Sequence, residues 1–175
     1  MNAATVSRTF LSIALMLILA ASLILAQVPK KGGAQLDCEK LLTAAEVGRI
    51  LGRPDVKFDS RGSQNGVVGS SVAICSYTSG DLHAVVSLQI EPTGALGDPY
   101  RIGKVGTFKD VQPRDVSGLG ASAKLWVTKN RAVLVVVAGS STLQVGAGWL
   151  GATGPQEADA EVAIAKLVVR RLPGR

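Results

Sequence analysis

The chain has 175 residues, of which 47% are hydrophobic and 4% aromatic, and its formal net charge at pH 7 is +6. The part that follows residue 26 is long enough for one hydrophobic core and too short for two ordinary domains. Its positive charges are dispersed instead of forming a basic run with interleaved aromatic residues, which argues against a nucleic-acid partner. The scarcity of aromatic residues also argues against an aromatic-lined ligand cavity.

The N-terminal 26 residues have the pattern of a secretory signal peptide. Arg8 precedes an uncharged, mostly apolar run over residues 10–26, and Ala26 is a small residue at the expected cleavage position. The alternative is an uncleaved membrane anchor, because a run of this length lies at the short limit for crossing a bilayer and Lys30 and Lys31 follow it. We favour cleavage; without it, this segment would provide the chain's membrane contact.

The sequence therefore divides into three predicted parts: a signal peptide over residues 1–26, a flexible linker over 27–37 and a single domain over 38–175. Pro29 and Gly32 are among the linker residues that do not favour regular structure. The predicted signal directs the domain out of the cytoplasm. We expect it to work in the periplasm, outside the cell or in association with the cell envelope.

Cys38 and Cys75 are the two cysteines of the chain. In an exported protein they are predicted to form one disulfide, and two separate buried thiols are the weaker alternative. His83 is the single histidine, and the sequence has no CxxC or HxxxH spacing, so we assign no metal ligands.

Residues 44–51 are predicted to form the first helix of the domain. Thr43 and Glu46 have the spacing of a capping box, in which each side chain bonds to the backbone N–H of the other residue. Gly52 is placed to end the helix in a left-handed conformation. A short turn over residues 38–42 is expected to precede it.

Five strands are predicted between this helix and a second one. Apolar and polar residues alternate over residues 82–91, which is the period of a half-buried strand. The five predicted strands are 72–78, 82–91, 123–128, 133–138 and 142–147. The last three are joined by short turns, which require antiparallel neighbours. The Gly-, Pro- and Asp-rich residues 92–120 are expected to form a long excursion with one strand near 109–116.

The second helix is predicted near the C-terminus. Thr153 or Gly154 caps its start, Pro155 fits its first turn, and Pro173 and Gly174 end it. The predicted fold is α+β, a helix, an antiparallel meander and a helix. Both helices would pack on one face of an antiparallel sheet of about five strands.

Three short segments resemble an uncharacterised family of bacterial cell-envelope domains. They are CEKLLTAAE over residues 38–46, CSY over 75–77 and DVSGLG over 115–120. Many members of that family are lipoproteins, whereas this chain lacks the lipid-accepting Cys directly after its apolar run. The resemblance implies an α+β fold and a location at the cell envelope, and it assigns no activity.

The pattern Gly118-x-Gly120-x-x-Ala123 matches a dinucleotide-binding fingerprint by its letters. That fingerprint binds pyrophosphate at the start of a helix, whereas here a predicted strand follows it. We therefore interpret it as a turn into a hairpin and assign no cofactor.

Two residues are weak candidates for a surface site. His83 lies on the polar side of its predicted strand, where an exposed structural role is the simpler interpretation. Trp126 shares a strand face with Lys124 and would either contribute to a binding surface or belong to the core or the sheet edge.

The sequence assigns no catalytic residue. It has no G-x-S-x-G elbow, and the cluster of Glu157, Asp159 and Glu161 is explained by the favourable position of acidic groups near a helix N-terminus.

The leading hypothesis is an exported, non-enzymatic accessory module that binds an unidentified protein or small ligand at the cell envelope. One alternative is a small exported hydrolase-type enzyme with a site built from His83 and carboxylates. The other is a structural protein tethered by an uncleaved signal anchor. The sequence identifies neither the ligand nor the oligomeric state.

Overall fold

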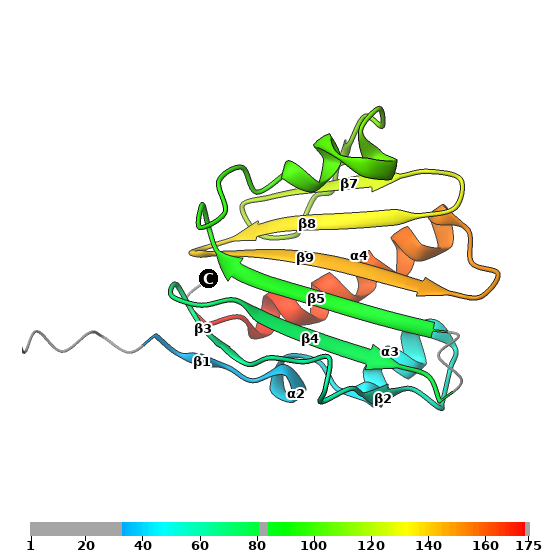
Figure 1. The fold of residues 1–175 in the computed structure, drawn as a ribbon, viewed down its shortest axis with the longest axis horizontal. Helices are drawn as coiled ribbons and strands as arrows, with labels where there is room; N and C mark the ends of the chain where they lie inside the picture. The colour runs from blue at the N-terminus through cyan, green and yellow to red at the C-terminus, as the bar shows by residue number, and fades with distance from the viewer. Residues whose placement is uncertain (1–32, 81–83, 174–175) are drawn as a thin grey trace, which may run out of the picture. The chain divides into compact units, whose positions relative to one another are not determined.

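The computed structural model describes residues 33–80 and 84–173 (Figure 1). The predicted signal peptide, the first part of the predicted linker and His83 therefore lie outside the described residues. Gly33–Arg175 cluster into one compact unit. Among the residues that the structure describes, no helix is long and apolar enough to span a membrane.

The described chain contains two antiparallel sheets, three α-helices and two 3₁₀ turns. The larger sheet consists of β2 (Lys57–Phe58), β4 (Ala73–Thr78), β5 (Ala84–Pro92), β6 (Arg114–Asp115), β7 (Ser122–Val127), β8 (Ala132–Ala138) and β9 (Ser141–Trp149). The smaller one pairs β1 (Gln35–Leu36) with β3 (Gly66–Val67). The helices are α2 (Cys38–Leu41), α3 (Ala44–Leu51) and α4 (Gly154–Arg171), and the 3₁₀ turns are η1 (Arg101–Lys104) and η2 (Gly106–Phe108).

The predicted α+β class and the helices on one face of the sheet are confirmed. Figure 1 shows α3 and α4 behind the sheet, so that the opposite face is turned towards the viewer. The five long strands occupy their predicted ranges to within two residues. The sheet has seven strands because β2 and β6, each of two residues, extend its edges.

The starts and ends of α3 and α4 follow local sequence signals. The α3 helix begins after Thr43, whose side chain accepts from the Glu46 N–H, and ends at Gly52 with φ +66°. Such a φ is strained for residues with a Cβ, so glycine is favoured there. The α4 helix begins after Thr153 with a capping box to Gln156, which the sequence interpretation had not included.

The expectation of one continuous meander is wrong. The strand order is β2-β4-β5-β9-β8-β7-β6, so β5 pairs with β9 and not with the next long strand in the sequence. Residues 93–113 carry the chain from β5 to the far side of the sheet. The β7, β8 and β9 strands then return towards β5, and β9 closes the sheet at its centre.

The two-residue strands were not all anticipated. Gln35–Leu36, which we assigned to the linker, forms β1 and pairs with β3. Two residues are too few to show an alternating pattern, so such strands have no clear sequence signature.

The main core lies between the sheet and the helices. Leu88 of β5, Val145 of β9, and Ile164 and Val168 of α4 are all fully buried there. Full burial of such a side chain contributes roughly 1.5–3 kcal/mol, so this layer supplies much of the driving force for folding.

A smaller core lies on the other face, where η1 and η2 fold over β7 and β8. Trp126, Val133 and Val135 are buried there against Tyr100 and Ile102. The salt bridge between Arg101 and the buried Glu91 ties this cover to β5, with N–O distances of 2.8 and 3.0 Å.

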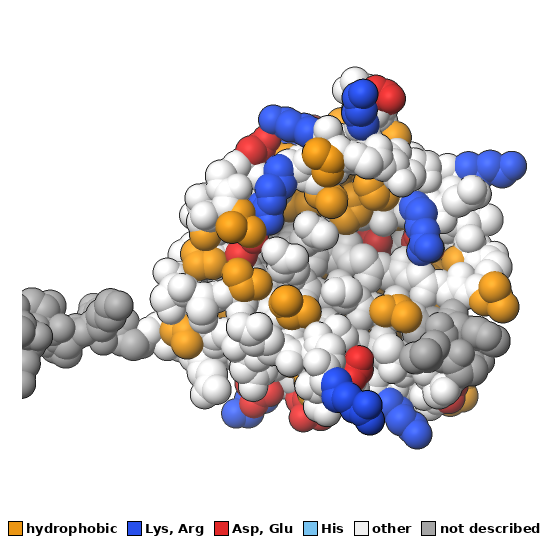
Figure 2. Space-filling view, viewed as in Figure 1, with side chains coloured by type: hydrophobic (Ala, Val, Ile, Leu, Met, Phe, Trp, Pro, Cys, Tyr) orange, Lys and Arg blue, Asp and Glu red, His pale blue; other side chains and the backbone are white. Residues whose placement is uncertain are grey.

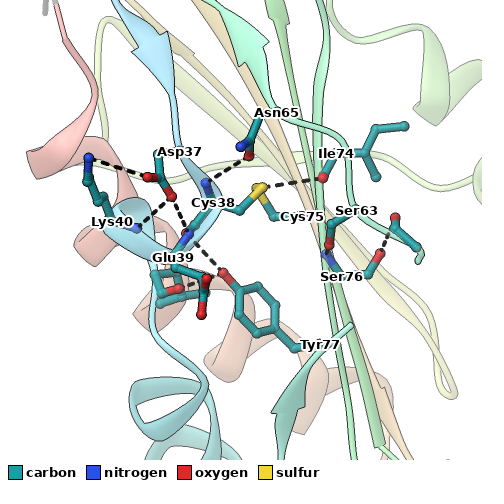
Figure 3. The surroundings of a disulfide bond; sticks show 12 residues. Asp37, Cys38, Glu39, Lys40, Ser63, Asn65, Ile74, Cys75, Ser76 and Tyr77 are labelled. Atoms are coloured by element: carbon teal, nitrogen blue, oxygen red, sulfur yellow. Dashed lines mark hydrogen bonds and ion pairs between the residues drawn. A yellow bond between two sulfur atoms is a disulfide. The ribbon is translucent and has the colours of Figure 1, made fainter. Parts of the chain in front are cut away.

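The predicted disulfide between Cys38 and Cys75 is present and joins α2 to β4, with the two Cα atoms 5.4 Å apart (Figure 3). Both cysteines are buried. The hydroxyl of Tyr77 lies beside them and donates to the carbonyl oxygens of Cys38, at 3.1 Å, and Leu42, at 2.6 Å. The disulfide and this hydroxyl therefore fix both ends of α2 to one strand.

Removal of the disulfide is expected to destabilise the domain. The bond joins residues 37 apart in the sequence, and the chain-entropy model gives a loop of that size roughly 4 kcal/mol of stability. The double variant Cys38→Ser/Cys75→Ser should therefore show a markedly lower Tm, with faster hydrogen exchange in α2 and α3 first. Oxidised and fully reduced wild-type protein with equal Tm values would contradict this prediction.

Candidate functional site

The central part of the second sheet face is not covered by helices. Val86, Leu88 and Ile90 of β5 point into the main core, so the alternate residues Val85, Ser87 and Gln89 face the other way. Figure 2 shows this face, whose centre is made mostly of polar side chains and backbone and is bordered above by hydrophobic side chains. The face combines an exposed ladder of strands with small and neutral side chains.

A pocket of about 700 Å³ lies at one end of this face. It is formed by the ends of β5 and β9 together with the turn between β7 and β8. Val85 and Leu150, exposed by 43% and 76%, contribute apolar surface, and Arg131 contributes a cationic side chain. The pocket therefore offers both apolar contact and a guanidinium to a ligand.

Two glycines of β9 form part of the pocket lining. A Cβ at Gly146 would meet nothing within 4 Å, so this position of β9 leaves the backbone open. A Cβ at Gly148 would lie 2.8 Å from Nη1 of Arg131 and 3.2 Å from Oε1 of Glu157. Gly148 thus gives these two side chains the space to meet.

The β8 and β9 strands stop pairing beside the pocket. Their register ends at Leu134 opposite Val145, although continuing it would place Ala132 opposite Ala147. The carboxylate of Glu157 accepts from the Ala132 N–H at 3.0 Å, and Glu161 accepts from the Ala147 N–H at 3.1 Å. Two side chains of α4 therefore satisfy N–H groups that the strands leave unpaired, and we call this arrangement the carboxyl seam.

The two carboxyl groups of the seam have different electrostatic environments. Glu157 is 2% exposed and lies 3.4 Å from Nη1 of Arg131, so its charge has a partner. Glu161 is fully buried, and burial raises its pKa from 4.5 to about 9; the Ala147 N–H lowers it and the nearby Glu157 charge raises it further. Glu161 is therefore protonated at neutral pH.

One oxygen of Glu161 stands out among the polar atoms that the structure describes. Its Oε2 is buried and has no hydrogen-bond partner within residues 33–80 and 84–173. An unsatisfied buried group costs about 1–3 kcal/mol. The protonated form reduces that cost, because burying a neutral carboxyl is far less unfavourable than burying a charge.

Paired carboxyl groups are able to act as general acid and base when a substrate reaches them. Here both oxygens of Glu157 already accept hydrogen bonds from the protein, and Glu161 has no exposed surface. The arrangement is suited to joining α4 to the sheet. It does not place a free carboxyl oxygen in the pocket.

The weak candidates from the sequence do not form a site together. His83 lies outside the described residues. Trp126 is only 3% exposed, and a Cβ at Gly103 of η1 would lie 2.1 Å from its indole ring. The backbone of η1 thus packs directly on the ring, which corrects the interpretation of Trp126 as a binding surface and agrees with the alternative of a core position.

The dinucleotide-like pattern lies in a turn before a strand, as the sequence interpretation expected. Gly118 and Gly120 form a turn that leads into β7, so no helix follows the dinucleotide-like pattern. No group of three or more His, Cys, Asp or Glu residues suited to a metal ion occurs among the described residues.

The sequence interpretation missed the buried roles of Glu157 and Glu161, which it assigned to the helix N-terminus. A signal for them was present, because Glu157, Glu161, Ile164 and Val168 follow the spacing of one helix face. All four are buried. Acidic residues in register with a buried apolar stripe indicate a carboxyl group that has a partner in the core.

A comparison of this chain with models of protein families, with curated proteins and with solved structures finds no match.

The buried acid predicts a specific dependence of stability on pH. Because the folded-state pKa of Glu161 is about 9, compared with 4.5 ordinarily, its contribution is fully present below pH 4.5 and is lost as the pH rises towards 9. The slope would reach about 1.4 kcal/mol per pH unit. Glu161→Gln, which keeps an acceptor for the Ala147 N–H, should flatten this slope and stabilise the protein at pH 8.

Denaturant unfolding between pH 5 and pH 9 measures this effect. Asp159→Asn is the matched control, because it replaces another acidic residue of the same helix with its amide at an exposed position. The control should keep the wild-type slope. An equal slope in Glu161→Gln and the wild type would show that Glu161 does not retain its proton in the folded state.

Proposed function

We propose that this chain is an exported, non-enzymatic module of the cell envelope that binds a protein or small ligand through the uncovered face of its sheet. The observation that carries the proposal is the pocket beside β5 and β9, where exposed apolar side chains, a guanidinium and open glycine backbone come together.

Export is supported by the N-terminal segment and by the disulfide. The uncharged run over residues 10–26 has the properties of a secretory signal. A buried disulfide is compatible with an oxidising compartment, where such bonds persist. The resemblance of residues 38–46 and 115–120 to a family of cell-envelope domains agrees with this location.

Binding at the uncovered face is supported by its long strand pairing and its shape. The β5 and β9 strands pair along nine residues, from Ala84 opposite Trp149 to Pro92 opposite Ser141. Because these strands are already paired, little of the protein has to become ordered when a ligand binds there. This reduces the entropic cost of association. The absence of a side chain at Gly146 lets a ligand approach the backbone closely.

The processing of the chain tests the first part of this proposal. Protein purified from the envelope fraction should have an intact mass that corresponds to a start near Gln27. A mass that includes residues 1–26 would favour the tethered structural protein, and recovery from the cytoplasm alone would contradict export.

The second part is tested with a variant that fills the pocket. Gly146→Leu should fold normally, because a Cβ there meets no atom within 4 Å and because leucine is tolerated in strands better than glycine. Isotope-labelled protein would be titrated with cell-envelope extract that has been separated into protein and small-molecule fractions. We expect one fraction to shift the NMR signals of Val85, Ser87 and Gly148.

Gly146→Leu should abolish these shifts. The control Ala45→Leu adds the same side chain at an exposed position of α3 and should retain them. Shifts that persist in Gly146→Leu, or that spread over the helical side instead, would place binding elsewhere and overturn this part of the proposal.

A further inference from the structure

A second pocket, of about 570 Å³, lies at the other end of β8, away from the uncovered face described above. It is formed by the turn before β7, by the turn between β8 and β9, and by the second half of α4. The turn before β7 contains Gly118 and Gly120, and α4 contributes Lys166 and Arg170. We call it the glycine-turn pocket.

Lys166 and Arg170 are one helical turn apart, and both are exposed. Within residues 33–80 and 84–173, neither side chain has a hydrogen bond or ion pair, and no lining residue of the pocket is acidic. The neighbouring Arg171 is different, because its guanidinium binds the Glu46 carboxylate and the Leu41 carbonyl. Two cations of the same helix thus remain available to the pocket.

The position of Lys166 is not explained by the helix dipole alone. Cations are favoured in the last turn of a helix, where the carbonyl groups carry partial negative charge, and this effect falls off within that turn. Arg170 lies in the last turn of α4, whereas Lys166 precedes it. Like charges four residues apart on a helix repel weakly, and an anion bound between them would relieve this repulsion.

The turn that lines this pocket contains backbone N–H groups without an acceptor among the described residues. Gly118 and Gly120 have φ values of +76° and +60°, and concave groups of N–H donors that bind anions form in turns where left-handed and right-handed residues are adjacent. Among the described residues, no acceptor is found for the N–H of Gly118, Leu119 or Gly120. A Cβ at Gly120 would lie 2.4 Å from the Val137 carbonyl oxygen, so the close approach requires glycine there.

We propose that the glycine-turn pocket binds an oxyanion, such as the phosphate group of a small ligand or of a lipid headgroup. The N–H groups of the turn donate to the anion from one side, and Lys166 and Arg170 neutralise it from the other. Leu119 and Val169, both buried, close the base of the pocket and provide apolar contact beside the charge.

The probe for a first experiment is inorganic phosphate, titrated into the purified, isotope-labelled protein at constant ionic strength. The amide signals of residues 118–121 should shift with a saturable dependence on phosphate concentration. The variant Lys166→Gln/Arg170→Gln should bind at least about tenfold more weakly, because it removes both charge-assisted contacts. The variant Lys57→Gln/Lys109→Gln loses the same charge away from the pocket and should change the affinity by less than about twofold.

A second arm separates the two sources of the phosphate group. Vesicles of phosphatidylcholine with and without phosphatidic acid would be sedimented with the wild-type chain and both double variants. Binding that requires phosphatidic acid and is lost only in Lys166→Gln/Arg170→Gln identifies a lipid headgroup as the ligand. Binding of inorganic phosphate without such vesicle binding identifies a soluble phosphate compound.

Either result supports the proposal. It is overturned if neither probe binds, or if Lys57→Gln/Lys109→Gln weakens binding as much as the pocket variant does, since that would show attraction by net charge alone. Circular dichroism of all variants establishes that they fold, which the exposed positions of all four side chains favour.

Discussion

Two backbone N–H groups, those of Ala132 and Ala147, constrain how α4 packs against the sheet. They lie where β8 and β9 have stopped pairing, and a buried N–H without an acceptor is strongly unfavourable. Glu157 and Glu161 supply the acceptors from one helix face, so the helix must lie at one position along the strands. The apolar side chains of α4 provide the driving force for packing, and the carboxyl seam provides its register. The same constraint explains why two acidic residues occupy a buried stripe.

The seam and the pocket on the uncovered face have a common origin. Because the two strands separate beyond Leu134 and Val145, the Glu157 carboxylate reaches the pocket between them and meets Arg131. That contact needs the space left by Gly148. The cover formed by η1 and η2 packs on β7 and β8, and the salt bridge between Arg101 and Glu91 ties it to the C-terminal end of β5. The part of the face that carries the pocket therefore stays open, and it lies where β8 and β9 stop pairing.

The sequence was most informative where structure depends on neighbouring residues. Thr43, Glu46 and Gly52 define α3 completely, and alternating residues locate each long strand, because capping and strand periodicity are local properties. The disulfide could also be predicted, since two cysteines allow one pairing. The position of β9 between β5 and β8 could not be predicted, because pairing between distant strands leaves little trace in a single sequence. The partners of Trp126, Glu157 and Glu161 likewise could not be predicted, because they lie in segments far away in the chain.

Helix α4 is held at its two ends by contacts that respond to pH in opposite directions. At its C-terminal end, hydrogen bonds from Arg171 and from the Thr43 backbone lower the pKa of Glu46 to about 2, so this contribution is present above pH 4.5 and is lost as the pH falls towards 2. At its N-terminal end, the raised pKa of Glu161 makes the seam most favourable below pH 4.5. The glycine-turn pocket adjoins the acid-sensitive half of α4, and the pocket on the uncovered face adjoins the alkali-sensitive half. Acid would therefore first weaken the contacts of α4 beside the glycine-turn pocket. Alkali would first weaken its contacts beside the pocket on the uncovered face. A single helix thus links both proposed binding areas to pH, in opposite directions.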